Sequence, residues 1–214
     1  METAYGSVAP QVTLFKSVFV NNESDSFYTW GGRTSFGEPQ IETNFWRFDA
    51  DGSGGGEWVD VTPSDKSDTF FDLKRSSAAS WTSTDDAGFI FGGNVYGSTE
   101  LEAERKGGAG YRTFNFTTQE WNEYYDTPYS EKDGLLFKGS ALFVPDFGPN
   151  GFIFLLGGFL DDTDPKSGLD FRTLHFLDPV ERKWYNQTTT GKVPGGRASA
   201  CVVGASTDDG RFDM

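Results

Sequence analysis

The chain has 214 residues, which is room for one domain or one and a half, and its 21 Phe, 8 Tyr and 6 Trp can build a sizeable core. A net charge of −14 opposes binding to nucleic acid, whose phosphates must be neutralised by Lys and Arg, and to anionic membrane surfaces. Short apolar runs separated by Gly, Asp, Ser and Thr predict an all-β protein.

Residues 1–11 are expected to form an N-terminal extension. They have neither a basic start nor an apolar centre, so they are not a secretory signal, and an exported protein would need a signal that is missing here. No apolar run approaches the roughly 20 residues that span a bilayer, so no membrane segment is expected in this chain.

A first structural unit is expected at 12–64. Its apolar run "FYTWGG" ends at the glycine pair Gly31-Gly32, and Trp58 follows 27 residues after the first glycine. The insert "DGSGGG" enlarges the turn before this tryptophan.

The segment "DADGSGGGEWVD" also has a partial match to a calcium-binding loop. Asp49, Asp51, Ser53, Glu57 and Asp60 fall at the first, third, fifth, ninth and twelfth places of such a loop. The last place lacks the usual bidentate Glu, and strands rather than helices are expected on both sides. An enlarged glycine-rich hairpin is therefore favoured, no cofactor is expected, and calcium is the alternative.

Two further units with the same features are expected at 65–128 and 129–190. Their apolar runs "FIFGG" and "FIFLLGG" end in glycine pairs at 92–93 and 157–158. The tryptophans recur every 63 residues, at Trp58, Trp121 and Trp184. This regular spacing favours packing between repeats over a sugar-binding platform.

Each unit is interpreted as four short strands. In the third unit the expected strands are 139–144, 151–158, 171–178 and 183–188. Asp178, like Asn115 in the second unit, lies six residues before the tryptophan and can close the hairpin with its side chain. Four-stranded sheets cannot bury both faces alone, but stacked radially they cover one another, which predicts a β-propeller.

Residues 191–214 are expected to begin a fourth unit. In "RASACVVGASTDDGRFDM", Cys201 is expected to be a small buried strand residue, and "RFDM" to begin a second strand. The chain stops before a fourth glycine pair, which predicts a fragment of a larger propeller. Such a fragment would leave two blade faces open to water, and these would favour aggregation or pairing with another chain.

The order of glycine pair, aromatic-rich strand and Asp or Asn six residues before Trp resembles the kelch repeat over essentially the whole chain. The segment "KWYNQTTTGKVPGGRASAC" also resembles the extracellular kelch-repeat proteins of filamentous fungi. The resemblance implies a kelch-type propeller portion of three four-stranded antiparallel blades plus part of a fourth. It implies little about function, since kelch propellers serve many roles.

The resemblance favours a non-catalytic module that binds a protein or a small ligand. Recognition is expected at the loops between strands two and three and between blades, where the first residues after the glycine pairs lie. The expected partner-binding residues are Arg33, Asn94, Tyr96, Phe159, Asp161 and Asp162.

The alternative is a propeller-fold oxidase or carbohydrate-active enzyme whose active site lies mostly in missing blades. Copper radical oxidases resembling galactose oxidase share this fold, but they need several histidine and tyrosine ligands and a cysteine joined to a tyrosine. The chain has one histidine, His175, on an expected strand, so no catalytic residue is expected here.

Three N-glycosylation acceptors fit an extracellular or cell-surface parent protein: Asn22, Asn115 and Asn186. Asn186, on an expected outer strand, is the best candidate. A membrane anchor, if the parent has one, is expected in the missing C-terminal part.

Overall fold

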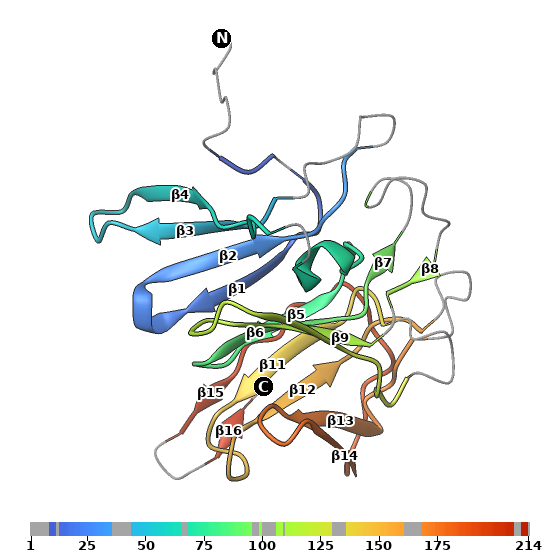
Figure 1. Ribbon diagram of the computed structural model, residues 1–214. Coiled ribbons are helices and arrows are strands. Elements are labelled where there is room, and N and C mark those ends of the chain that lie inside the picture. Colours follow the sequence, from blue (N-terminus) through green and yellow to red (C-terminus); the bar gives the residue numbers. More distant parts are fainter. Residues whose placement is uncertain are drawn as a thin grey trace.

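The computed structural model describes residues 9–11, 13–35, 44–65, 68–95, 99, 106–108, 110–129, 136–160, 168–207 and 211–213. In this part of the chain the regular elements are β-strands and two short 3-10 turns, η1 (Asn22–Ser24) and η2 (Thr69–Asp72), with no α-helix. Figure 1 shows the sheets following one another in chain order, from blue through green to orange. The all-β prediction is confirmed.

Three antiparallel sheets of four strands form the blades, and in each the strands pair in chain order. Blade 1 consists of β1 (Ser17–Asn21), β2 (Ser26–Trp30), β3 (Trp46–Ala50) and β4 (Gly56–Asp60). Blade 2 consists of β5 (Ser80–Ser83), β6 (Ala87–Phe91), β9 (Tyr111–Asn115) and β10 (Trp121–Tyr124). Blade 3 consists of β11 (Ser140–Val144), β12 (Phe152–Leu156), β13 (Thr173–Asp178) and β14 (Lys183–Thr188).

Two smaller antiparallel pairs complete the sheets. The pair β7 (Asn94–Val95) and β8 (Lys106–Gly107) lies in the connection between β6 and β9. The pair β15 (Ala205–Ser206) and β16 (Phe212–Asp213) is the beginning of a fourth blade and lies beside β11 in Figure 1. The predicted three blades and part of a fourth are therefore present.

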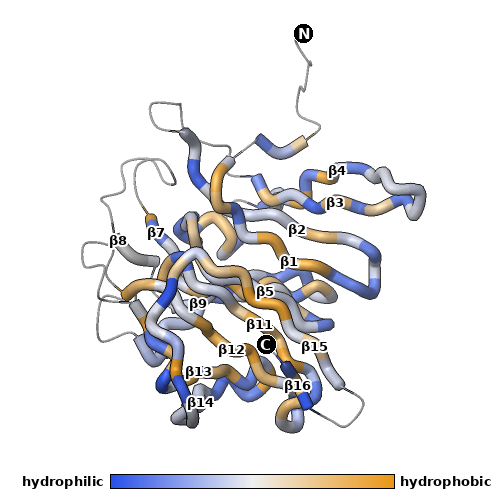
Figure 2. Tube along the Cα trace, turned by 180° about the vertical axis from the view of Figure 1, so that it is seen from behind, coloured by the Kyte–Doolittle hydropathy of each residue, from blue (hydrophilic) through white to orange (hydrophobic). Residues whose placement is uncertain are grey.

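The first strands β1, β5 and β11 are neighbours in space, so the blades converge along them and fan out toward β4, β10 and β14. Between blades 1 and 2, Phe19 and Phe45 of the first pack with Trp121 of the second. Between blades 2 and 3, Phe91 packs with Trp184. Figure 2 shows the apolar residues (orange) concentrated along β1, β11 and β12. The core thus lies between the sheets, as the tryptophan spacing predicted.

The glycine pairs are needed because the backbone of the next blade packs directly against them. The N–H groups of Gly32, Gly93 and Gly158 donate to carbonyl oxygens of the following blade at 3.0, 2.8 and 2.6 Å. At Gly31, with φ +73°, a Cβ would lie 2.6 Å from the carbonyl oxygen of Ser76. Any side chain would therefore push the blades apart.

A second series of backbone hydrogen bonds runs from blade to blade close to the first strands. The N–H of Ala78 donates to Phe15 at 3.3 Å, Lys138 donates to Ala78 at 2.7 Å, and Ser199 donates to Lys138 at 2.7 Å. All four residues have positive φ, between 55° and 59°. Because Ser199 continues the series, the fourth repeat docks on blade 3 as another blade does.

Cys201 is exposed, so the expectation of a buried strand residue was wrong. It lies just after Ala200, whose carbonyl oxygen accepts from the Ser140 hydroxyl of β11, and it lines a pocket beside the first strands of blades 2 and 3. Beside it, Val202 packs with Phe212 against the apolar face of blade 3. Apolar sequence indicated the strand-like run, but it did not indicate which side of the run meets solvent.

Candidate functional site: the mouth end and the groove along the first strands

The mouth end is the end of the blades at which the second strands finish and the glycine pairs lie. There, Arg33, Asn94 and Phe159 take equivalent places, each directly after a glycine pair. Each forms an isolated antiparallel bridge with the residue that leads into the first strand of its own blade: Leu14, Ser77 and Phe137. Both backbone bonds are made in every bridge, at 2.8–3.2 Å. Three of the six predicted contact residues are thus brought to one end of adjacent blades.

The side chains at this end differ between blades. In blade 1, the Arg33 guanidinium lies 5.5 Å from the ring of Phe15, which is 53% exposed, beside Leu14, which is 46% exposed. In blade 3, Phe159 packs against buried Phe137 with ring centroids 5.6 Å apart. Aromatic residues and Arg are enriched in protein interfaces, and Phe15 and Arg33 are of these two types.

The other three predicted contacts, Tyr96, Asp161 and Asp162, lie outside the described residues. Most of each long loop between strands two and three does so as well. Asn94 is described, and it is buried, with 9% of its surface exposed. It also pairs with Gly107 in the small β7–β8 ribbon.

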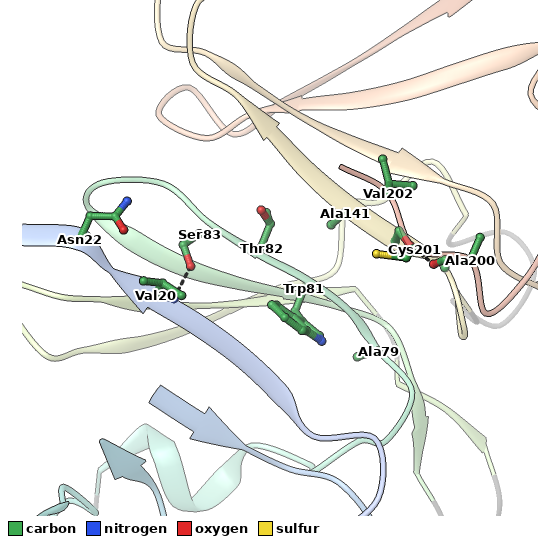
Figure 3. Close-up of a pocket in the computed structure, with 12 residues that line it drawn as sticks. Val20, Asn22, Ala79, Trp81, Thr82, Ser83, Ala141, Ala200, Cys201 and Val202 are labelled. Carbon is green, nitrogen blue, oxygen red and sulfur yellow. Dashed lines mark hydrogen bonds between the residues drawn. The ribbon is translucent and has the colours of Figure 1, made fainter. Parts of the chain in front are cut away.

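A groove of about 550 Å³ runs along the first strands of the blades and was not predicted from the sequence (Figure 3). It is lined by Val20, Asn22, Ala79, Trp81, Thr82, Ser83, Gly139, Ser140, Ala141, Ala200, Cys201 and Val202. Trp81, which is 40% exposed, and the Cys201 thiol lie on this surface. Most of the lining residues are small because the blades are closest together along these strands.

Hydrogen bonds between neighbouring blades join the strands that line the groove. The backbone N–H of Val20 donates to the Ser83 hydroxyl at 2.7 Å, and the Ser140 hydroxyl donates to the Ala200 carbonyl oxygen at 2.6 Å. The runs "SSAAS", "GSA" and "RASAC" supply many of these small residues. Their recurrence was visible in the sequence and could have indicated a lining along the propeller centre.

The five calcium candidates are not gathered into one site. Asp49 forms a two-pronged ion pair with Arg47, with a 2.6 Å contact from Nε to Oδ1. Asp60 lies at the far end of β4, where its Oδ1 accepts from the Thr62 N–H at 3.0 Å. Within the described residues, which include all five candidates, no group of three or more His, Cys, Asp or Glu could hold a metal ion.

Asp51 instead closes the turn between β3 and β4. Its Oδ1 accepts from the Ser53 N–H at 2.8 Å, the Ser53 hydroxyl at 2.7 Å and the Gly55 N–H at 3.1 Å, which lowers the pKa of Asp51 below its usual value. Glu57 lies across from Asp49 in the hairpin. This turn is the enlarged hairpin that the sequence favoured.

The turns of the other two blades use the residues predicted for them. In blade 2, Asn115 accepts from the Thr117 and Thr118 N–H groups at 2.9 and 2.8 Å. In blade 3, Asp178 accepts from the Val180 and Glu181 N–H groups at 2.9 and 2.8 Å.

Asp178 is buried, and Asn150 adds a further hydrogen bond to its carboxylate. Burial raises the pKa of Asp178, but the hydrogen bonds from Glu181, Asn150 and Val180 outweigh it and leave the pKa lowered. The fold therefore stabilises the ionised form of Asp178.

His175 lies within β13, as expected, with its ring 5.2 Å from the ring of Tyr129. Burial lowers the pKa of His175, so the neutral imidazole is favoured. The same effect raises the pKa of the Tyr129 hydroxyl. Both residues act here as packing groups.

The three glycosylation acceptors lie in different settings. Asn22 is exposed at the start of η1, and Asn186 is exposed on the edge strand β14. Asn115 is half-buried, with its side-chain oxygen engaged in the turn. Among the described residues, no helix combines the length and the apolar character needed to cross a membrane.

The repeated four-stranded sheets, joined through glycine pairs and packed on tryptophans, define this chain as a portion of a β-propeller. No protein-family model matches the chain. A stretch of 72 residues, 34% of the chain, is 35% identical to a "Kelch repeat-containing protein" of Arthroderma benhamiae and covers 10% of that protein's length. The predicted resemblance to fungal kelch-repeat proteins is thereby confirmed.

Proposed function

We propose that the chain is a non-catalytic binding module that recognises a protein partner at the mouth end. The observation that supports this most directly is the repeated bridge that places Arg33, Asn94 and Phe159 at one end of three adjacent blades. A scaffold of rigid strands that carries variable residues at one end is the usual way to build a recognition surface. The exposed Phe15 and Leu14 beside Arg33 supply the apolar part of that surface.

The test is a comparison of two triple variants in a capture experiment. In the mouth variant, Arg33, Asn94 and Phe159 are replaced by alanine, which keeps the backbone bridges. In the control variant, Ser53, Thr117 and Val180, one exposed turn residue per blade at the opposite end, are replaced by alanine. Immobilised proteins are exposed to the extracellular proteins of a filamentous fungus, and the retained proteins are identified by mass spectrometry.

The expected result is a set of proteins that the wild-type and control proteins retain and the mouth variant loses. Equal retention by the mouth variant would place recognition elsewhere. Retention of nothing above the blank resin would also count against the proposal.

We further propose that the parent protein is extracellular or at the cell surface, with Asn186 glycosylated. Its side chain is exposed on an edge strand, so an attached sugar would displace no packed residue. Secretion of the chain from a eukaryotic host behind an added signal should give a mass that falls on deglycosylation. The Asn186→Gln variant should show a smaller fall, and an unchanged fall would contradict the assignment.

A further inference from the structure

The turn between β11 and β12 contains Asn150, which is followed directly by Gly151. The chain has eight asparagines, and this is the one that has a glycine after it. Residues 145–149 of the same turn are exposed, and Asn150 itself is half-buried. The asparagine therefore lies in a turn that meets water, at the end of the blades opposite the mouth end.

An asparagine side chain can be attacked by the backbone nitrogen of the residue that follows it. The nitrogen loses its proton and bonds to Cγ, the bond between Cγ and Nδ2 breaks, and ammonia leaves. Water then opens the resulting ring at one of its two carbonyl carbons, which gives aspartate or isoaspartate. A following glycine favours the attack, because it has no Cβ to hinder the approach of its nitrogen.

The backbone at Gly151 suits this reaction. Gly151 precedes Phe152, the first residue of β12, so its N–H is not part of the pairing between β11 and β12. In the described part of the chain it donates none of the backbone hydrogen bonds of the turns and loops. Its φ is +70°, a conformation that glycine adopts without strain. No internal hydrogen bond therefore holds the proton that the attacking nitrogen must lose.

The amide of Asn150 binds a buried carboxylate. Nδ2 donates to Oδ2 of Asp178 at 3.0 Å and to Oδ1 at 3.2 Å. Asp178 is 1% exposed and also accepts from the N–H groups of Val180 and Glu181. The amide thus joins the turn between β11 and β12 to the turn between β13 and β14. Because these hydrogen bonds hold the amide, the reaction proceeds from the molecules in which the turn has opened locally.

We propose that Asn150 is a deamidation site and that its conversion destabilises the end of blade 3 opposite the mouth end. In the aspartate product an oxygen takes the place of Nδ2, so two carboxylates face each other where an amide donated hydrogen bonds. Two carboxylates that share a buried site repel each other strongly, because little water is present to screen them. Isoaspartate, the other product, adds a backbone atom directly before β12.

The first test follows the asparagine-containing peptides by mass spectrometry while the whole chain is incubated at mildly alkaline pH. The chain is produced in a bacterial host, so that no sugar is attached. The peptide with Asn150 should lose its amide form, whereas the peptides with Asn22, Asn122 and Asn186 should keep theirs. These three asparagines are exposed, but each is followed by a glutamate or a glutamine. If Asn150 keeps its amide as long as they do, the proposal is overturned.

The second test measures what the new carboxylate does to stability. Asn150→Asp reproduces the aspartate product, and urea denaturation at pH 7 gives its folding equilibrium constant. The constant should be about 10-fold or more below that of the wild-type protein, which corresponds to a pKa raised by one unit in one carboxyl of the pair. Asn150→Ala removes the hydrogen bonds without adding a charge and should lose less. Asn122→Asp adds the same charge at an exposed position of β10 and should change little.

An exchange of the two residues tests whether the paired carboxylates are the cause. In the double variant Asn150→Asp with Asp178→Asn, the amide at position 178 can donate to the carboxylate at position 150. Its oxygen can still accept from the turn, as that of Asn115 does in blade 2. The double variant should therefore be more stable than Asn150→Asp alone.

Two results of the stability measurements would contradict the proposal. One is an Asn150→Asp variant as stable as the wild-type protein, and the other is a double variant no more stable than Asn150→Asp. The mass measurement on the wild-type chain stands whether or not the variants fold. None of these results affects the recognition proposed for the mouth end, because the turn that contains Asn150 lies at the opposite end of the blades.

Discussion

Trp58 and Trp121 occupy the same place in consecutive blades, yet their surroundings differ. Trp121 is 3% exposed and lies within 6.1 Å of rings from both blades, among them Phe45 and Phe19. Trp58 is half-buried and contacts the rings of its own sheet. The repeat determines where a tryptophan stands, whereas its contribution to stability depends on whether another blade covers it.

The largest effect expected from this comparison is that of removing the two tryptophans. Trp121→Ala should lower the free energy of unfolding by about 3–5 kcal/mol, since it empties a closed core. Trp58→Ala should cost about 1–2 kcal/mol, since less apolar surface is buried there. Urea denaturation measures both, at a concentration where light scattering gives the mass of one chain. Equal losses of stability in the two variants would show that Trp58 and Trp121 contribute equally, whether or not another blade covers them.

Two glycines allow the same comparison between a position packed against another blade and a position exposed in a turn. Gly92 has φ +61°, and an added Cβ would collide with the carbonyl oxygen of Leu136 in the next blade. Gly54 has φ +95°, and nothing lies within 4 Å of its added Cβ. Both alanine variants should lose about 1–2 kcal/mol from the backbone, and Gly92→Ala about 1–3 kcal/mol more from the collision.

Thermal and urea unfolding of the two glycine variants provide the measurement. Gly54→Ala serves as the control for the backbone conformation alone. If both variants lost the same stability, the interface between blades would be loose enough to accept a methyl group.

The smallest effect concerns the turns of blades 2 and 3, which differ in charge. Asp178 has a lowered pKa, so its contribution to stability is present above the ordinary value of 3.8 and is lost as the pH falls through the lower folded value. Asp178→Asn, which copies Asn115, should cost about 1 kcal/mol at neutral pH, because charged acceptors bind more strongly than neutral ones.

Unfolding free energies at pH 7 and pH 3 test this difference. The loss on acidification should be smaller in Asp178→Asn than in the wild-type protein. Asp51→Asn extends the comparison to a turn in full contact with water, where hydrogen bonds from Ser53 and Gly55 also lower the pKa of the carboxyl group. An unchanged pH dependence in Asp178→Asn would contradict the role of its carboxylate.

Much of the fold followed from short local patterns. The strands expected at 183–188 and 171–178 correspond closely to β14 and β13, because apolar alternation and turn residues act locally. The roles of Asn115 and Asp178 were also predicted, since a side chain that closes its own turn needs no distant partner. For Asp51 the sequence favoured an enlarged hairpin and left a calcium site as the alternative, because its spacing also partly fits a calcium-binding loop.

The candidate sites were less predictable. The spacing of the glycine pairs indicated that Arg33, Asn94 and Phe159 are equivalent, but their bridges to the chain entering each blade required the structure. The exposure of Cys201 and the groove beside it depend on how several blades converge, which no single strand encodes.

The sequence by itself determined a repeated, all-β chain that resembles the kelch repeat, because the same glycine pairs, tryptophans and turn residues recur at a regular spacing. Only the tertiary structure decided which of those residues are covered. The glycine pairs are required by the carbonyl oxygens of the next blade, and Trp121 is buried by the previous one. Burial between blades is a property of neighbours in space, and for that reason Trp58 and Trp121 look alike in sequence and differ in the folded protein.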